Sequence, residues 1–116
     1  MILVTIRESV MPHAIILYEF IVGKRTYRQF DDENDALQDI VRVFEKQLSQ
    51  KTHQSGIIEY EISDVLVFVD NVFDLGLLVC NDALKAYNAY GKPEIKEKLE
   101  WFLTRHLCSP LQSKKE

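Results

Sequence analysis

The chain has 116 residues and a mass of 13.6 kDa, enough for one domain with a hydrophobic core and too little for two. Its composition, 47% hydrophobic and 28% charged, is that of a globular protein rather than a disordered or fibrous one. The formal net charge of −4 argues against phosphate binding, and the two cysteines, Cys80 and Cys108, show neither a CxxC spacing nor a disulfide framework.

The first six residues are apolar apart from Thr5, but Arg7 interrupts them well short of the ~20 residues that a membrane-spanning helix needs. They also lack the positive start and cleavage site of a secretory signal. We therefore expect an intracellular protein in which residues 1–10 form an N-terminal extension, with Met11 as an alternative start. The domain is expected over residues 11–108, followed by a disordered tail over residues 109–116.

Residues 13–22 are rich in β-branched and aromatic side chains and end at Gly23, which predicts a strand followed by a turn. Residues 24–30 alternate loosely and predict the second strand of a hairpin. The acidic run at residues 31–35 then offers cap residues and negative charge for the start of a helix. Apolar residues follow at helical spacing and predict an amphipathic helix of about four turns: Leu37, Ile40, Val41, Phe44 and Leu48. A polar loop is expected over residues 52–56.

Residues 62–75 fit two structures, because their four valines favour a strand whereas the spacing of their apolar residues favours a helix. Ser63 as an N-cap, with Asp64 behind it, favours the helix. Gly76 would then end that helix as its C′ residue.

The last part of the chain predicts a second hairpin and a final helix. Residues 77–80 and 85–90 are the strands, joined by a turn at Asn81-Asp82. Pro93 lies at or near the first position of the helix, which is expected to end at residues 109–110. Its apolar stripe consists of Ile95, Leu99, Phe102 and Leu103.

The predicted order β-β-α-α-β-β-α describes an α+β protein with a four-stranded antiparallel sheet and three α-helices on one face. The strands are apolar on both faces, for example at residues 15–18 and 77–80. Because three helices cover only one face, the other face would expose more apolar surface than monomers usually tolerate. We therefore expect a homodimer joined through the sheets by a two-fold axis.

Each candidate catalytic or metal-binding residue has a simpler structural interpretation. The three histidines show no ligand-like spacing, Ser63 lies in no GxSxG motif, and the glycines form no phosphate-binding loop. The carboxylates Asp64, Asp70 and Asp74 fit a solvated helix face better than a catalytic pair. We expect no enzymatic activity, no catalytic or metal-binding residue and no cofactor, which leaves a surface for binding another protein.

Three unusual motifs follow one another along the chain: RTY at 25–27, IEYEIS at 58–63 followed by FVD at 68–70 and Leu75, and YNAY at 87–90 followed by IKEK at 95–98. Their order and spacing, over about residues 11–106, resemble the enhancer of rudimentary homolog family. The resemblance implies the fold described above, a homodimer joined through the sheets, and a helix rather than a strand over residues 62–75.

The resemblance also implies a non-enzymatic adapter that binds short, often helical segments of RNA-processing proteins. Such partners include factors of mRNA elimination, splicing and microRNA maturation, and small-RNA assemblies in nematodes. The implied location is the nucleus, the cytoplasm or the perinuclear region, with no membrane as a partner.

Two sets of interaction residues are expected, the first from the resemblance and the second from the apolar pattern of the helices. By position, Ile15 and Leu17 match the family residues that meet across the two-fold axis, and Tyr27 and Leu78 are expected beside them in the dimer interface. A partner groove is expected among apolar side chains that lie off or beside the main stripes of the last two helices, namely Val69, Phe73 and Trp101. The alternative is that these three residues belong to the core.

The chain departs from the family pattern in places. In the first hairpin, residues 20–22 (Phe-Ile-Val) replace a polar, proline-containing loop, and Gln29 replaces the acid that would make Thr26 a kinase site. At the start of the last helix, residues 93–94 (Pro-Glu) replace an acid followed by an aromatic. These departures suggest a divergent paralogue, for example in a nematode, with a partner set narrowed toward a germline small-RNA complex such as one of piRNA biogenesis.

The alternative function is that of a weak RNA-binding subunit that uses the basic residues of the first hairpin, Lys24, Arg25 and Arg28. Three cations beside an acidic run are few for strong phosphate binding. The charge balance therefore argues against direct nucleic-acid binding.

Overall fold

The computed structural model describes residues 12–52 and 59–105. Its elements are β1 (Ala14–Ile21), β2 (Lys24–Phe30), α2 (Glu33–Thr52), α3 (Ile62–Asn71), β3 (Asp74–Asn81), β4 (Ala86–Tyr90) and α4 (Lys92–Leu103). This order confirms the predicted α+β class, with four strands in one sheet and three helices among the described residues. The predicted extension over residues 1–10, the tail over residues 109–116 and the end of the last helix lie outside the described residues.

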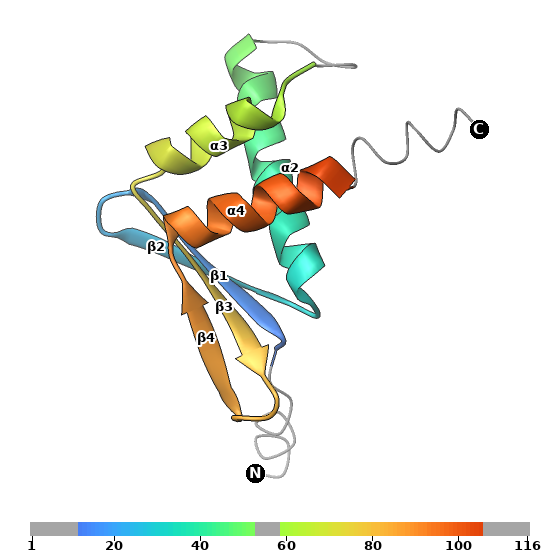
Figure 1. Ribbon diagram of the computed structural model, residues 1–116. Helices are drawn as coiled ribbons and strands as arrows, with labels where there is room; N and C mark the ends of the chain where they lie inside the picture. The colour runs from blue at the N-terminus through green and yellow to red at the C-terminus, as the bar shows by residue number, and fades with distance from the viewer. Residues whose placement is uncertain (1–11, 53–58, 106–116) are drawn as a thin grey trace, which may run out of the picture.

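The strands form one antiparallel sheet in the order β2-β1-β3-β4, so β1 and β3 are central and β2 and β4 are edges. The three helices lie together on one side of this sheet (Figure 1). Alternate residues of β1 show which side they cover, because Ile16 and Tyr18 are almost completely buried whereas Ile15 and Leu17 are only partly buried. None of the described helices is both long enough and apolar enough to cross a membrane.

The core lies between the covered face of the sheet and the apolar stripes of the helices. The stripe predicted for α2 faces this core, and all four residues of the stripe predicted for α4 are buried there. From the sheet, Ile16, Leu75 and Leu77 contribute fully or almost fully buried side chains. Each such side chain contributes roughly 1.5–3 kcal/mol to the free energy of folding, so the stripes hold the layers together.

Helix α3 confirms the helix prediction for this segment, but both of its predicted ends are wrong. Its N-cap is Glu61 rather than Ser63, because the Asp64 carboxylate accepts a hydrogen bond from the Glu61 backbone N–H at 2.8 Å. Its C-cap is Val72, which already has an extended backbone, so the helix does not continue to Gly76. Gly76 instead lies within β3, opposite Leu17 of β1.

Other boundaries differ by a few residues. Helix α2 continues to Thr52, which was expected to begin a loop, and the rest of that loop lies outside the described residues. Strand β3 begins at Asp74, three residues before the predicted strand, because the chain extends directly after α3. The second hairpin turns over residues 82–85 rather than at Asn81-Asp82, with Lys85 in the left-handed region at φ 54°.

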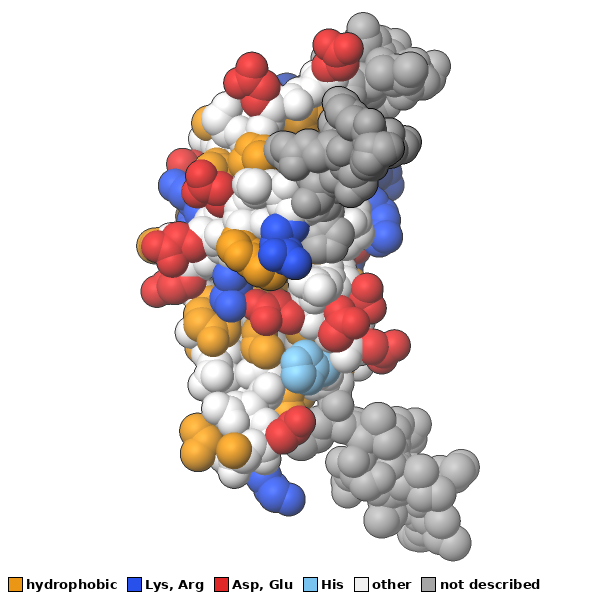
Figure 2. Space-filling view, turned by 45° about the vertical axis from the view of Figure 1, so that its right-hand side comes forward, with side chains coloured by type: hydrophobic (Ala, Val, Ile, Leu, Met, Phe, Trp, Pro, Cys, Tyr) orange, Lys and Arg blue, Asp and Glu red, His pale blue; other side chains and the backbone are white. Residues whose placement is uncertain are grey.

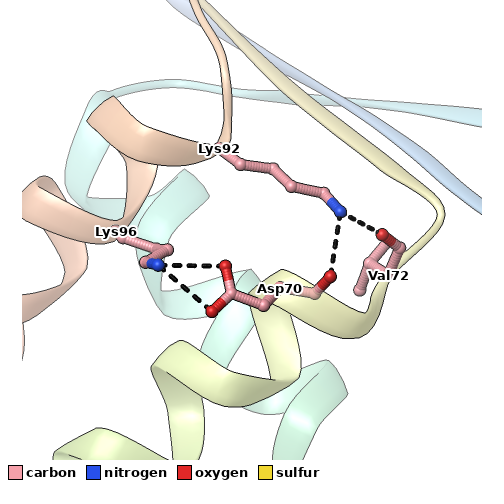
Figure 3. Close-up of polar contacts among 4 residues, drawn as sticks. All are labelled: Asp70, Val72, Lys92 and Lys96. Carbon is pink, nitrogen blue, oxygen red and sulfur yellow. Dashed lines mark hydrogen bonds and ion pairs between the residues drawn. The ribbon is translucent and has the colours of Figure 1, made fainter.

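Two lysines join the start of α4 to the end of α3 (Figure 3). The Lys92 ammonium group donates hydrogen bonds to the backbone carbonyls of Asp70, at 3.1 Å, and of Val72. One turn later, the Lys96 ammonium group donates to both carboxylate oxygens of Asp70, at 2.9 and 3.1 Å. A cation at these carbonyls satisfies acceptors that the helix end leaves unpaired, so the contact fixes where α3 stops and β3 begins.

A buried polar cluster ties α2 to the sheet. The Asp39 carboxylate accepts a hydrogen bond from the Tyr18 hydroxyl at 2.8 Å and two from the Arg28 guanidinium at 3.0 and 3.1 Å. The guanidinium also lies 5.6 Å from the centre of the Tyr18 ring. Burial, and then the hydrogen bond to Asp39, raise the pKa of Tyr18 far above its ordinary value, so its hydroxyl remains a donor.

Candidate protein-interaction surface

The side of the sheet away from the helices, here named the open face, carries apolar side chains on all four strands. Two rows of paired residues cross it: Gln29–Ile15–Leu78–Ala89 and Tyr27–Leu17–Gly76. Cys80 and Tyr87 form a further pair at the β3–β4 end. Paired residues of antiparallel strands point to the same face, so these side chains form one continuous surface.

All four residues predicted for the dimer interface lie together on the open face. Ile15, Leu17 and Leu78 are partly buried by their neighbours, whereas Tyr27 on edge strand β2 is 63% exposed. Gly76 carries no side chain, and an added Cβ there would approach the Leu17 Cβ at 3.9 Å. The open face is therefore apolar at Leu17, where Gly76 adds no side chain, and the exposed Tyr27 side chain lies on the edge strand.

Polar contacts bound the open face at both ends. At the turn of the first hairpin, the Glu19 carboxylate accepts hydrogen bonds from the Gly23 N–H at 2.7 Å and from Arg25 Nε at 3.1 Å. At the other end, the Tyr87 hydroxyl donates to the carbonyl of Pro12 at 2.8 Å. The hydrogen bond from Gly23, assisted by Arg25, lowers the pKa of Glu19 below its ordinary value.

The lowered pKa of Glu19 predicts that this carboxylate stabilises the hairpin in a pH-dependent way. Since the folded pKa lies below the unfolded value of 4.5, the stabilisation is fully present above pH 4.5 and is lost as the pH falls through the folded pKa. We expect Glu19→Gln to lower the melting temperature at neutral pH, and the difference from the wild type to close in acid. Thermal unfolding followed by circular dichroism between neutral and acidic pH measures this, and a difference that stayed constant with pH would contradict it.

The basic residues considered for RNA binding do not form one patch. Arg25 pairs with Glu19 on the open face, and Arg28 pairs with Asp39 on the side that faces the helices. Of these three residues only Lys24 has no ion-pair partner among the described residues. Two of the three cations are thus partly neutralised, and they point to opposite sides of β2.

The three residues predicted for a partner groove lie in different environments. Val69 is completely buried in the core, so it belongs to the alternative interpretation and does not line a groove. Phe73 is 55% exposed at the connection between α3 and β3, and Trp101 is 58% exposed near the end of α4. Lys92 contacts Val72, and Trp101 follows nine residues later, about 13 Å along the helix. Phe73 and Trp101 therefore lie near opposite ends of α4 and do not form one groove.

The carboxylates weighed as acid–base groups each have a structural contact. Asp64 caps α3, Asp70 pairs with Lys96, and Asp74 accepts a hydrogen bond from the adjacent Leu75 N–H at 2.9 Å. Among residues 12–52 and 59–105, no three His, Cys, Asp or Glu side chains gather in a way that could hold a metal ion.

Comparisons with known proteins identify relatives that cover most of the chain. The family described as Enhancer of rudimentary matches residues 11–109 of the chain. The chain is 34% identical over 91 residues to "Enhancer of rudimentary homolog" of Dictyostelium discoideum, which covers 77% of this chain and 91% of that protein. It is 29% identical over 86 residues to "Protein enhancer of rudimentary" of Drosophila virilis, covering 74% of this chain and 83% of that protein. It is 27% identical over 99 residues to "Enhancer of rudimentary homolog" of Caenorhabditis elegans, covering 84% of this chain and 96% of that protein.

Proposed function

Because the chain belongs to the Enhancer of rudimentary family, we propose that it is a homodimeric, non-enzymatic adapter that binds short segments of partner proteins in RNA-processing complexes. The observation that carries this proposal is the open face, an apolar surface that no described helix covers. An uncovered apolar surface of this kind favours association with another protein surface.

A second copy of the chain is the occupant that best suits the open face. The apolar residues are central, on β1 and β3, and the polar contact of Glu19 and Arg25 lies at the end of the strands. A two-fold axis through the centre would place Ile15 and Leu17 of one protomer against the same residues of the other, which keeps apolar groups together. The dimer would leave the helix side of both protomers accessible, so it would present two copies of any docking site there.

Oligomeric state tests the proposal directly. We expect the wild-type protein to elute as a particle of about 27 kDa, twice the mass of the chain, in size-exclusion chromatography with light scattering. Ile15→Arg together with Leu17→Arg should yield monomers or insoluble protein, because the interface would bury unpaired charges. A wild-type monomer at dilute concentration, or a soluble double-variant dimer, would contradict the proposed interface.

Val67→Arg is the matched control for this experiment. Val67 is an apolar residue of α3 that is 55% exposed on the helix side, so adding a charge there should leave the dimer intact. The adapter role is tested with the same variants by affinity capture from native cells and mass spectrometry. Wild type and Val67→Arg should enrich the same RNA-processing proteins, and an enriched set without such proteins would contradict the role.

A further inference from the structure

Trp101 is the only tryptophan of the chain and stands on α4 between two shallow hollows. One hollow, of about 280 Å³, lies between the first turns of α2 and the second half of α4. Leu37 and Lys98 are among its lining residues. The other hollow, of about 430 Å³, lies along the last turns of α4 and just beyond its end, and its lining includes Glu100, Thr104 and Arg105. Trp101 and Glu97 line both hollows, so the indole separates two places that a binding segment could fill.

The indole is held in an exposed position by its own helix. Its neighbours Phe102 and Leu103, and Leu99 two residues before it, are buried in the core, so Trp101 points away from that core. The Arg105 guanidinium lies 4.6 Å from the ring centre, one turn along the helix. This cation–π contact orders the ring without burying it. An exposed but ordered tryptophan loses little conformational entropy on binding, which is typical of interface hot spots.

The charges around Trp101 are not balanced. Lys98 is engaged by Glu33 at 2.6 Å and also lies 4.4 Å from the centre of the Tyr90 ring. The carboxylates of Glu97 and Glu100, by contrast, belong to exposed residues and have no ion-pair or side-chain hydrogen-bond partner among the described residues. Figure 2 shows acidic and basic side chains interspersed with small apolar groups over one face of the molecule. The Arg105 guanidinium beside the ring offsets only one of the two glutamate charges, so the surroundings of the indole keep a negative excess and favour a cationic ligand.

We propose that Trp101, Glu97 and Glu100, here named the Trp101 site, dock a partner segment that carries lysine or arginine beside a large apolar residue. The apolar residue enters the hollow beside Leu37, and the cation lies between the indole and the two carboxylates. RNA is excluded from this site by the same carboxylates, which repel phosphates. The inference deepens the proposed adapter function and rests on it, since it states the chemistry of the segments that such an adapter would bind.

Because Trp101 is the only tryptophan, its fluorescence reports on this site alone. The probe is a short synthetic helix of leucine and lysine, compared with the same helix in which glutamate replaces lysine. We expect the leucine–lysine helix to cause a saturable blue shift and to protect the indole from acrylamide quenching, with an affinity that falls as salt is raised. The leucine–glutamate helix should do neither.

Variants separate the site from the overall charge of the protein. Glu97→Lys with Glu100→Lys should weaken binding of the leucine–lysine helix by about tenfold or more, and Trp101→Ala should do the same in calorimetry. The matched control is Glu59→Lys with Asp82→Lys, which makes the same change of net charge at exposed residues elsewhere and should weaken binding much less. Equal weakening by both pairs, or equal binding of both helices, would overturn the proposal.

Two further outcomes are informative. If a chain shortened after residue 108 showed a red-shifted, more quenchable indole before any probe was added, the occupant would be the protein's own tail, and the proposal would be wrong. The dimer variant Ile15→Arg with Leu17→Arg, where soluble, should bind the probe as the wild type does, because the open face lies on the other side of the sheet. Failure of the Trp101 site is thus distinguishable from failure of the dimer.

Discussion

Replacing Val69 by Asp should leave the protein largely unfolded. Val69 is fully buried in α3, where it packs in the core between the helices and the sheet. An aspartate there would be ionised in an apolar environment without a partner, or would have to remain protonated, and either costs more than about 4 kcal/mol. Since domains of this size are stable by roughly 5–15 kcal/mol, we expect a loss of cooperative unfolding in urea and of near-ultraviolet circular dichroism.

Val67 provides the control, because it is the same residue type in the same helix and is 55% exposed. Val69→Ala should reduce the free energy of unfolding by about 2–3 kcal/mol, from lost burial and the cavity left behind. Val67→Ala should change it by no more than about 0.5 kcal/mol. Helix propensity changes equally in both variants, so the difference between them measures burial. Equal effects would show that Val69 is a surface residue after all.

Asp39→Ala should reduce the free energy of unfolding by about 3 kcal/mol, the second large effect that we expect. The substitution leaves the buried Tyr18 hydroxyl without its acceptor and removes both hydrogen bonds from Arg28. The Arg28 side chain is 48% exposed and can be rehydrated, so most of the loss comes from Tyr18 and from the cavity. Urea unfolding at neutral pH measures the change.

Asp70→Ala is the matched control for Asp39. It also removes a carboxylate that accepts two hydrogen bonds from one cation, but its side chain is 52% exposed. Solvent screening limits such a pair to about 1 kcal/mol or less, and a carboxylate near the end of α3 is also unfavourable to the helix dipole. A loss for Asp39→Ala no larger than that for Asp70→Ala would contradict the structural role assigned to the buried cluster.

The variants of Val69 and Asp39 should affect function as well as stability. Asp39 connects α2 to β1 and β2, and β1 and β2 carry Leu17 and Tyr27 of the open face on their other side. Val69 helps to hold α3 on the same sheet. The helix layer thus supports the apolar surface on which the proposed dimer depends, so a core variant should weaken dimerisation once its loss of stability populates the unfolded chain.

The sequence alone predicted the elements whose side chains repeat with a clear period. The stripes of α2 and α4 were identified from apolar spacing, and the doubly apolar strands indicated an uncovered side of the sheet. Periodicity is reliable because burying one face is the main source of stability for an element. The start of α3 was wrong because Ser63 is a preferred N-cap residue, whereas the helix begins after Glu61, whose backbone N–H donates to the Asp64 carboxylate.

The predicted interaction residues also include some that the sequence could place and others whose surroundings only the tertiary structure decided. The resemblance to the family predicted Ile15, Leu17, Tyr27 and Leu78 for one interface, and the pairing of β1 with β2 and with β3 in the structure places all four on the same face. The sequence did not separate Val69 from Phe73 and Trp101, because it assigned all three to helix positions off or beside the main stripe. In the structure Phe73 lies after the end of α3, and only the packing of the elements decides which of the three side chains is covered. The contacts of Asp39 with Tyr18 and Arg28 join residues 21 and 11 positions away along the chain, and no local pattern encodes them. Period and alternation are local properties of the chain, whereas burial and charge pairing depend on which elements meet in space.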